Sequence, residues 1–169
     1  MPDICDLILD DHEVFRRRFA ELDLERQSGA ETVGALWGPV AEHLERHAAA
    51  EEEIFYPLLL QGGAEAEEET DDAIRDHNKI RDAVRQVAGA EPGSEDWWDA
   101  VGRARYENSD HMAEEERGPL ASMRQHTDHQ LRAELGTRFV AFNSGHAGGR
   151  NVDTDDKDPD EYIKDHTEG

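Results

Sequence analysis

The stretch His47-Ala48-Ala49-Ala50-Glu51-Glu52-Glu53-Ile54-Phe55-Tyr56-Pro57 decides how this chain folds. It places a histidine and a carboxylate four residues apart inside a run of helix-forming residues. Positions i and i+4 of an α-helix lie nearly one above the other, so His47 and Glu51 share one face and can hold one cation between them. The spacing therefore predicts a metal-binding face on a helix.

The same pattern occurs again at His111-Met112-Ala113-Glu114-Glu115-Glu116, and a lone histidine, His12 or His77, precedes each copy. His77 follows His12 by 65 residues, and His111 follows His47 by 64 residues. The neighbours of these histidines also correspond, in the pairs Asp11 and Asp76, Arg16 and Arg81, and Glu52 and Glu116. The repeat predicts two helical hairpins that combine into a pseudo-symmetric bundle.

Apolar residues recur at helical spacing over residues 3–27, 31–61, 66–88 and 95–117, which predicts four long helices. Short loops between them favour an all-α, antiparallel up-down four-helix bundle. Shorter helices are expected at 119–126 and 128–143, so that residues 1–143 form one domain. Residues 144–169 are rich in Gly, Asp, Lys and Pro, and we expect a flexible, disordered acidic tail there, with at most a short turn of helix at 159–165.

The composition excludes several classes of partner. The 169 residues carry 41 acidic and 18 basic side chains, and the net charge of −23 argues against nucleic acid or an anionic membrane as partner. Cys5 is a single cysteine, so no internal disulfide can form. No apolar run approaches the roughly 20 residues that span a bilayer, and the N-terminus lacks the features of a signal peptide. We therefore expect a cytoplasmic protein, whose protein partner stays open.

Six ionisable residues replace apolar ones along the inward faces of the predicted helices. Buried ionisable groups are costly unless they are paired or bind a metal. Imidazole combined with carboxylate favours iron or manganese over copper, and each carboxylate can bridge two metals roughly 3.5–4 Å apart. The predicted ligands are His12, His47, Glu51, His77, His111 and Glu115.

The order of these residues resembles the hemerythrin-like proteins of the HHE cation-binding family. The motifs that match are His12, His47-x-x-x-Glu51, His77 and His111-x-x-x-Glu115, and the resemblance covers residues 4 to 123. Ferritin-like bundles differ, because they use Glu-x-x-His at i and i+3. The resemblance implies a hemerythrin-like bundle that holds two non-haem iron ions bridged by oxo and carboxylate groups.

Two positions depart from the respiratory hemerythrins of this family. Those proteins have a second histidine on the third helix where this chain has Arg81, and an aspartate on the fourth helix where it has Glu116. These departures imply a more symmetric ligand set and argue against reversible oxygen carriage. His43, Tyr56 and Tyr106 stand near the predicted ligands, and we interpret them as neighbours or packing residues; a ligand role for them stays open.

The resemblance also implies a function in which the iron centre binds or reacts with O2, peroxide or nitric oxide during oxidative or nitrosative stress. Two alternatives stay open. One is a catalase-like enzyme that decomposes peroxide, and the other is an iron or oxygen sensor that acts through a partner. Whether the protein is an enzyme is left undecided, because the sequence identifies no general acid or base.

Overall fold

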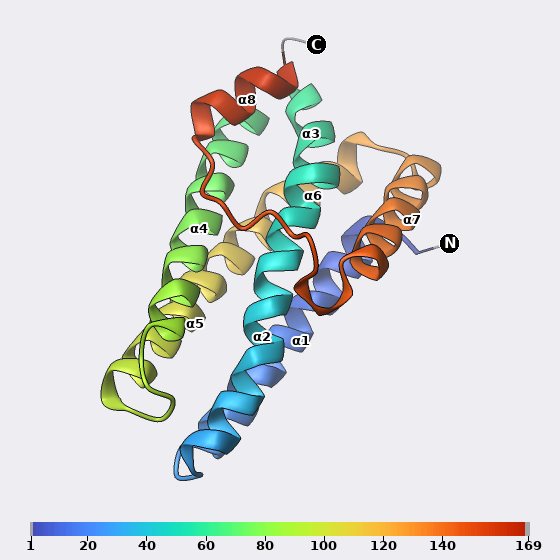
Figure 1. The fold of residues 1–169 in the computed structure, drawn as a ribbon. Helices are drawn as coiled ribbons and strands as arrows, with labels where there is room; N and C mark the ends of the chain where they lie inside the picture. Colours follow the sequence, from blue (N-terminus) through green and yellow to red (C-terminus); the bar gives the residue numbers. More distant parts are fainter. Residues whose placement is uncertain (1, 168–169) are drawn as a thin grey trace.

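The structure is a computed structural model that describes residues 2–167, and it confirms the all-helical fold (Figure 1). The helices are α1 (Ile4–Leu24), α2 (Ala30–Ala50), α3 (Tyr56–Leu59), α4 (Ala64–Ala88), α5 (Glu95–Arg117), α6 (Pro119–His126), α7 (His129–Gly145) and α8 (Pro159–Thr167). A π-helical turn (Glu51–Phe55) joins α2 to α3, and 3₁₀ turns cover Leu60–Gly62 and Ala147–Gly149. Helices α1, α2, α4 and α5 are the long elements, and they lie side by side (Figure 1).

The apolar core is divided into two clusters by the layer that contains the histidines. Along α1, Ile8 belongs to one cluster and Phe15 to the other, and His12 lies between them. Along α4, Ile74 and Ile80 are divided in the same way. Burial of both apolar clusters fixes the helices on either side of the polar layer, and burial of each large apolar side chain contributes roughly 1.5–3 kcal/mol. The core therefore sets the position of the site.

The junction of α2 and α3 is widened into a π-helical turn at Glu51–Phe55. The Tyr56 N–H donates to the carbonyl of Glu51, five residues back, instead of four. Pro57 has no N–H, so it cannot continue the regular ladder at this point. Such turns occur mostly as single insertions in α-helices and frequently at functional sites. Here the turn begins at one of the predicted ligands and ends beside Tyr56.

The C-terminal part differs from the expected flexible tail. After α7, the segment 146–158 crosses α2 and reaches α4, where α8 packs (Figure 1). Tyr162 of α8 is buried, and the side-chain amide of Asn78 donates to the carbonyl of Lys157 at 2.7 Å. Specific polar contacts and one buried aromatic ring hold this segment, although its composition has the signature of disorder. Within residues 2–167, no helix is long and apolar enough to span a membrane.

Helix α7 lies against the N-terminal segment at Gly136. A Cβ atom added at Gly136 would lie 2.0 Å from the carbonyl oxygen of Pro2 and 3.1 Å from the amide nitrogen of Ile4. The absence of a side chain at Gly136 therefore permits this close approach of two backbones.

We predict that Gly136→Ala lowers the free energy of unfolding by about 1–3 kcal/mol, because the backbones must separate to admit the methyl group. Urea unfolding measures this change. Gly102→Ala in α5 is the matched control, since a Cβ atom there has no neighbour within 4 Å. It should raise stability by about 0.5–1 kcal/mol, as Ala does in a helix interior. Equal effects of both substitutions would contradict the close packing of α7.

Candidate metal centre

The six predicted ligands lie together in the polar layer between the two apolar clusters. They come from α1, α2, the π-helical turn, α4 and α5, and each is at most 3% exposed. They form two groups in which the candidate ligand atoms all lie within 4.8 Å of one another. One group is His12, His47, Glu51 and Glu115, and the other is Glu51, His77 and His111. Each group has the dimensions of a site for one cation.

Glu51 belongs to both groups, whereas Glu115 belongs to one. The sequence predicted that both carboxylates bridge, and the observed arrangement favours Glu51 as the bridge. The Tyr56 hydroxyl donates to Glu115 Oε1 at 2.7 Å, which occupies one of the two oxygens of that carboxylate. The two halves of the site are therefore unequal: one offers two histidines and two carboxylates, and the other offers two histidines and the shared Glu51.

The inward-facing atoms of this layer fit a bound cation. Several are completely buried and have no hydrogen-bond partner: His12 Nε2, His47 Nε2, both carboxylate oxygens of Glu51, and Glu115 Oε2. His47 Nε2 approaches Glu51 Oε1 to 2.9 Å, but the direction of approach does not make a hydrogen bond. Leaving buried polar atoms unpaired is costly, and shared coordination of a metal removes that cost.

Each of the four histidines also faces a carboxylate with its other ring nitrogen. The Nδ1 partners are Glu116 for His12 at 2.9 Å, Asp11 for His47 at 3.0 Å, Glu52 for His77 at 2.8 Å and Asp76 for His111 at 3.9 Å. An Nδ1–H that donates to a carboxylate leaves the lone pair on Nε2, which is the arrangement typical of metal-binding histidines. These four acids are the repeated pairs of the sequence, so the repeat contained their signal.

Arg16 and Arg81, which correspond in the sequence repeat, hold the carboxylates that face the histidines. Arg81 donates from one guanidinium nitrogen to both oxygens of Glu52 at 2.9 Å, and Arg16 donates to Glu116 at 2.6 Å. Arg81 is fully buried, whereas Arg16 is partly exposed. Where respiratory hemerythrins carry a ligand histidine, this chain uses Arg81 to fix the carboxylate behind His77.

Three further residues with an open role are now placed. Tyr56 is buried and contacts Glu115, and burial together with the charge of Glu115 raises the pKa of its phenol well above the ordinary value. His43 Nε2 lies 3.1 Å from Asp11 Oδ1, outside both groups. Tyr106 is 66% exposed and lies away from the site.

The sequence contains no sign that residues after 150 contact the carboxylates behind the histidines, as Lys157 contacts Glu52, because these residues have no periodic pattern.

Comparison with known proteins identifies the family. A model described as the hemerythrin HHE cation-binding domain matches residues 3–121, so the chain belongs to this family. A protein named DNA nickase from Nostoc sp. (strain PCC 7120 / SAG 25.82 / UTEX 2576) is 24% identical over 141 residues. The alignment covers 83% of this chain but 39% of that relative, so the chain spans well under half of the relative's length. No solved structure matches the chain significantly.

Separate substitutions of Glu51 and Glu115 test whether Glu51 alone is shared by the two groups. We predict that Glu51→Gln leaves fewer than about one iron per chain, because both groups lose a ligand, whereas Glu115→Gln keeps about one. Elemental analysis after loading with ferrous iron measures the difference. Glu114→Gln, on the neighbouring position of α5, serves as the control and should bind as the wild type does. Equal losses in the Glu51 and Glu115 variants would contradict a single shared carboxylate.

The metal-free protein should lose stability as the pH rises from 6.5 to 9. Burial alone would lower the pKa of His77, but hydrogen bonds and charge from Glu51 and Glu52 raise it from 6.5 to about 9. A raised pKa contributes stability that is fully present below 6.5 and is lost as the pH rises through 9. Urea unfolding in the presence of a chelator measures this slope. His77→Gln should flatten the slope, and an unchanged slope in that variant would contradict the assignment.

Proposed function

We propose that this chain holds two iron ions in an antiparallel up-down four-helix bundle and binds O2, peroxide or nitric oxide there. The proposal rests chiefly on one observation. The family's cation-binding domain contains two adjoining groups of buried histidine and carboxylate atoms that share Glu51, and several of these atoms, including both oxygens of Glu51, have no hydrogen-bond partner. Histidine with carboxylate is a ligand set that suits iron.

The protein's own groups prepare the site in three ways. The outer carboxylates hold the imidazole rings so that Nε2 faces the centre. The two apolar clusters exclude bulk water from either side, which strengthens every charge interaction between them. When two iron ions are bound, they supply Lewis acidity and electrons to a small ligand.

A small cavity adjoins the site. It has a volume of about 90 Å³ and is lined by Tyr56, His111 and Glu115 together with acidic residues of α4 and α5. This cavity has room for a diatomic molecule or peroxide, since even one water-sized probe needs only about 10–15 Å³ by this measure. Its lining includes one candidate ligand from each group, His111 from the group of three and Glu115 from the group of four.

Peroxide decomposition is a second candidate, favoured by the Tyr56 phenol that lines this cavity. Burial and the charge of Glu115 raise the pKa of the Tyr56 phenol, so Tyr56 keeps its proton at neutral pH and donates a hydrogen bond to Glu115. The hydroxyl is therefore positioned to hold a proton at the edge of the space that peroxide would enter.

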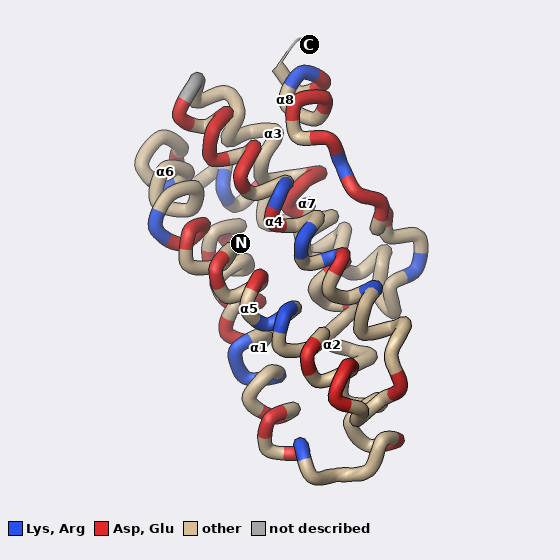
Figure 2. Tube along the Cα trace, turned by 90° about the vertical axis from the view of Figure 1, so that its left-hand side faces the viewer, with Lys and Arg blue, Asp and Glu red and all other residues tan. Residues whose placement is uncertain are grey.

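The relative from Nostoc is named a DNA nickase. The net charge of this chain argues against the same activity for it. The net charge is −23, and acidic positions are spread along the helices and the C-terminal segment (Figure 2). DNA-binding proteins gain most of their non-specific affinity from Lys and Arg contacts with phosphates. We therefore propose a small ligand and no nucleic acid as partner for this chain.

The test is the iron content of the isolated protein, combined with its visible and ultraviolet spectrum before and after the addition of nitric oxide or peroxide. We expect about two irons per chain and a spectrum that responds to these ligands. His47→Ala should lose the response and most of the iron. Sustained O2 evolution from peroxide would favour the second candidate, whereas stable adducts would favour binding. A wild-type protein that takes up zinc alone or no metal would contradict both.

A further inference from the structure

Glu52 is the carboxylate behind His77, and it is enclosed far more completely than its counterpart in the repeat. Glu52 is 3% exposed, whereas the side chain of Glu116, behind His12, is 29% exposed. Arg81 reaches Glu52 from inside the bundle, and the two partners of Glu116 come from α1 alone.

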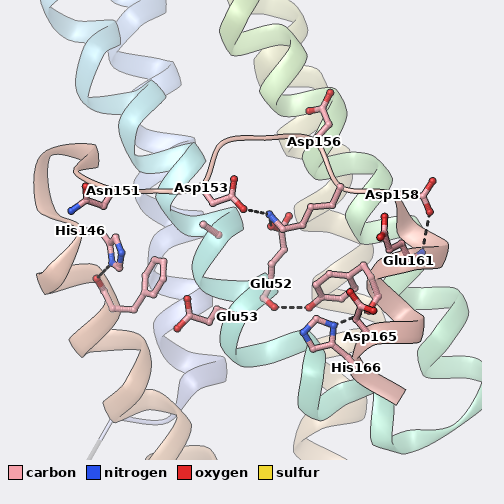
Figure 3. A pocket seen from close by; sticks show the side chains of 14 residues that line it. Glu52, Glu53, His146, Asn151, Asp153, Asp156, Asp158, Glu161, Asp165 and His166 are labelled. Carbon is pink, nitrogen blue, oxygen red and sulfur yellow. Dashed lines mark hydrogen bonds and ion pairs between the residues drawn. The ribbon is translucent and has the colours of Figure 1, made fainter. Parts of the chain in front are cut away.

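The additional contacts to Glu52 come from the C-terminal segment, defined here as residues 150–167. Lys157 Nζ lies 3.0 Å from Glu52 Oε2, and the Tyr162 hydroxyl donates to the backbone carbonyl of Glu52 at 2.5 Å. Asp153 pairs with Lys157 at 3.0 Å and fixes its ammonium group from the far side. Figure 3 shows Glu52 facing this segment, with Asp153 on the loop that crosses above Glu52.

The segment is fastened to α4 next to His77 itself. Asn78 donates to the carbonyl of Lys157 at 2.7 Å, and the Lys157 N–H donates to the side-chain oxygen of Asn78 at 3.0 Å. Arg85, two turns further along α4, pairs with Asp156 at 2.8 Å. These contacts place the Lys157 ammonium at one position above the buried carboxylate.

Packing under the segment is otherwise loose. A cavity of about 450 Å³ lies between it and the bundle, lined by Glu52, Glu53, Phe142 and His146 on one side and by Lys157 and Tyr162 on the other (Figure 3). Tyr162 and Ile163 of α8 pack on the apolar core, whereas the part of the segment above Glu52 is held by polar contacts. Its grip on Glu52 comes from the Lys157 ion pair and the Tyr162 hydrogen bond.

We propose that Lys157 and Tyr162 are positioning residues for one half of the metal centre, acting through Glu52 on His77. This inference rests on the proposed function. Both residues lie outside the part of the chain that the family domain matches, which ends at residue 121. The group that contains His77 has three protein ligands where the other group has four, so its hold on a cation depends more strongly on the alignment of each histidine.

The experiment measures how fast each iron leaves the full-length protein. Wild type, Lys157→Met, Tyr162→Phe and Lys164→Met are loaded anaerobically with ferrous iron and mixed with excess ferrous chelator, and the absorbance of the chelate is followed. Lys164 is exposed on the same segment, so its variant is the matched control for loss of a lysine charge. Glu52→Gln is the reference for complete loss of the carboxylate behind His77.

In the Lys157 and Tyr162 variants, one of the two irons should leave about three- to tenfold faster, and the other should leave at the wild-type rate. Glu52→Gln should accelerate the same phase by about ten- to a hundredfold, the usual effect of losing the partner of a ligand histidine. The unchanged release of the second iron is the readout that separates positioning from a merely structural role, because a general loosening of the bundle would accelerate both phases.

Two results would overturn the inference alone: release kinetics equal to those of Lys164→Met, or equal acceleration of both irons. A wild-type protein that takes up fewer than two irons would overturn the proposed function and this inference with it. The wild-type iron content thus separates the two failures before any variant is compared.

Discussion

Six ionisable side chains buried at the centre of a helical bundle are the constraint on which the rest of this structure depends. Several of their inward atoms lack hydrogen-bond partners, and all six side chains are almost completely buried. An arrangement of this kind is stable only if something of opposite charge joins the carboxylates and accepts the imidazole lone pairs. The outer acids and the arginines behind them follow from the same requirement, since each fixes the charge and direction of the next group inward.

Much of this centre could be predicted from the sequence. The spacing of His47 and Glu51 placed them on one helical face, and the repeat paired them with His111 and Glu115; the structure brings these residues together with His12 and His77. The predicted helix 95–117 agrees with α5, whereas the predicted helix 31–61 is divided by the π-helical turn after Ala50. Whether all six residues bind metal remains a prediction that the experiments above address.

Other features have no short-range signal in the sequence. Glu115 belongs only to the group with His12 and His47, and one of its oxygens accepts a hydrogen bond from Tyr56, 59 residues away in the chain. The π-helical turn sets the position of the Tyr56 ring. The ordered C-terminal segment depends on single long-range contacts, such as that between Asn78 and Lys157. Its Gly, Asp and Pro content has the composition of a disordered tail, and composition does not report specific docking partners.

The central claim is that two metal ions share Glu51 within this layer, and anomalous diffraction at the iron edge from crystals of the loaded protein tests it most directly. The account predicts two peaks about 3.5–4 Å apart. One should lie among His12, His47, Glu51 and Glu115, and the other among Glu51, His77 and His111. A single peak, or peaks outside this layer, would contradict the account.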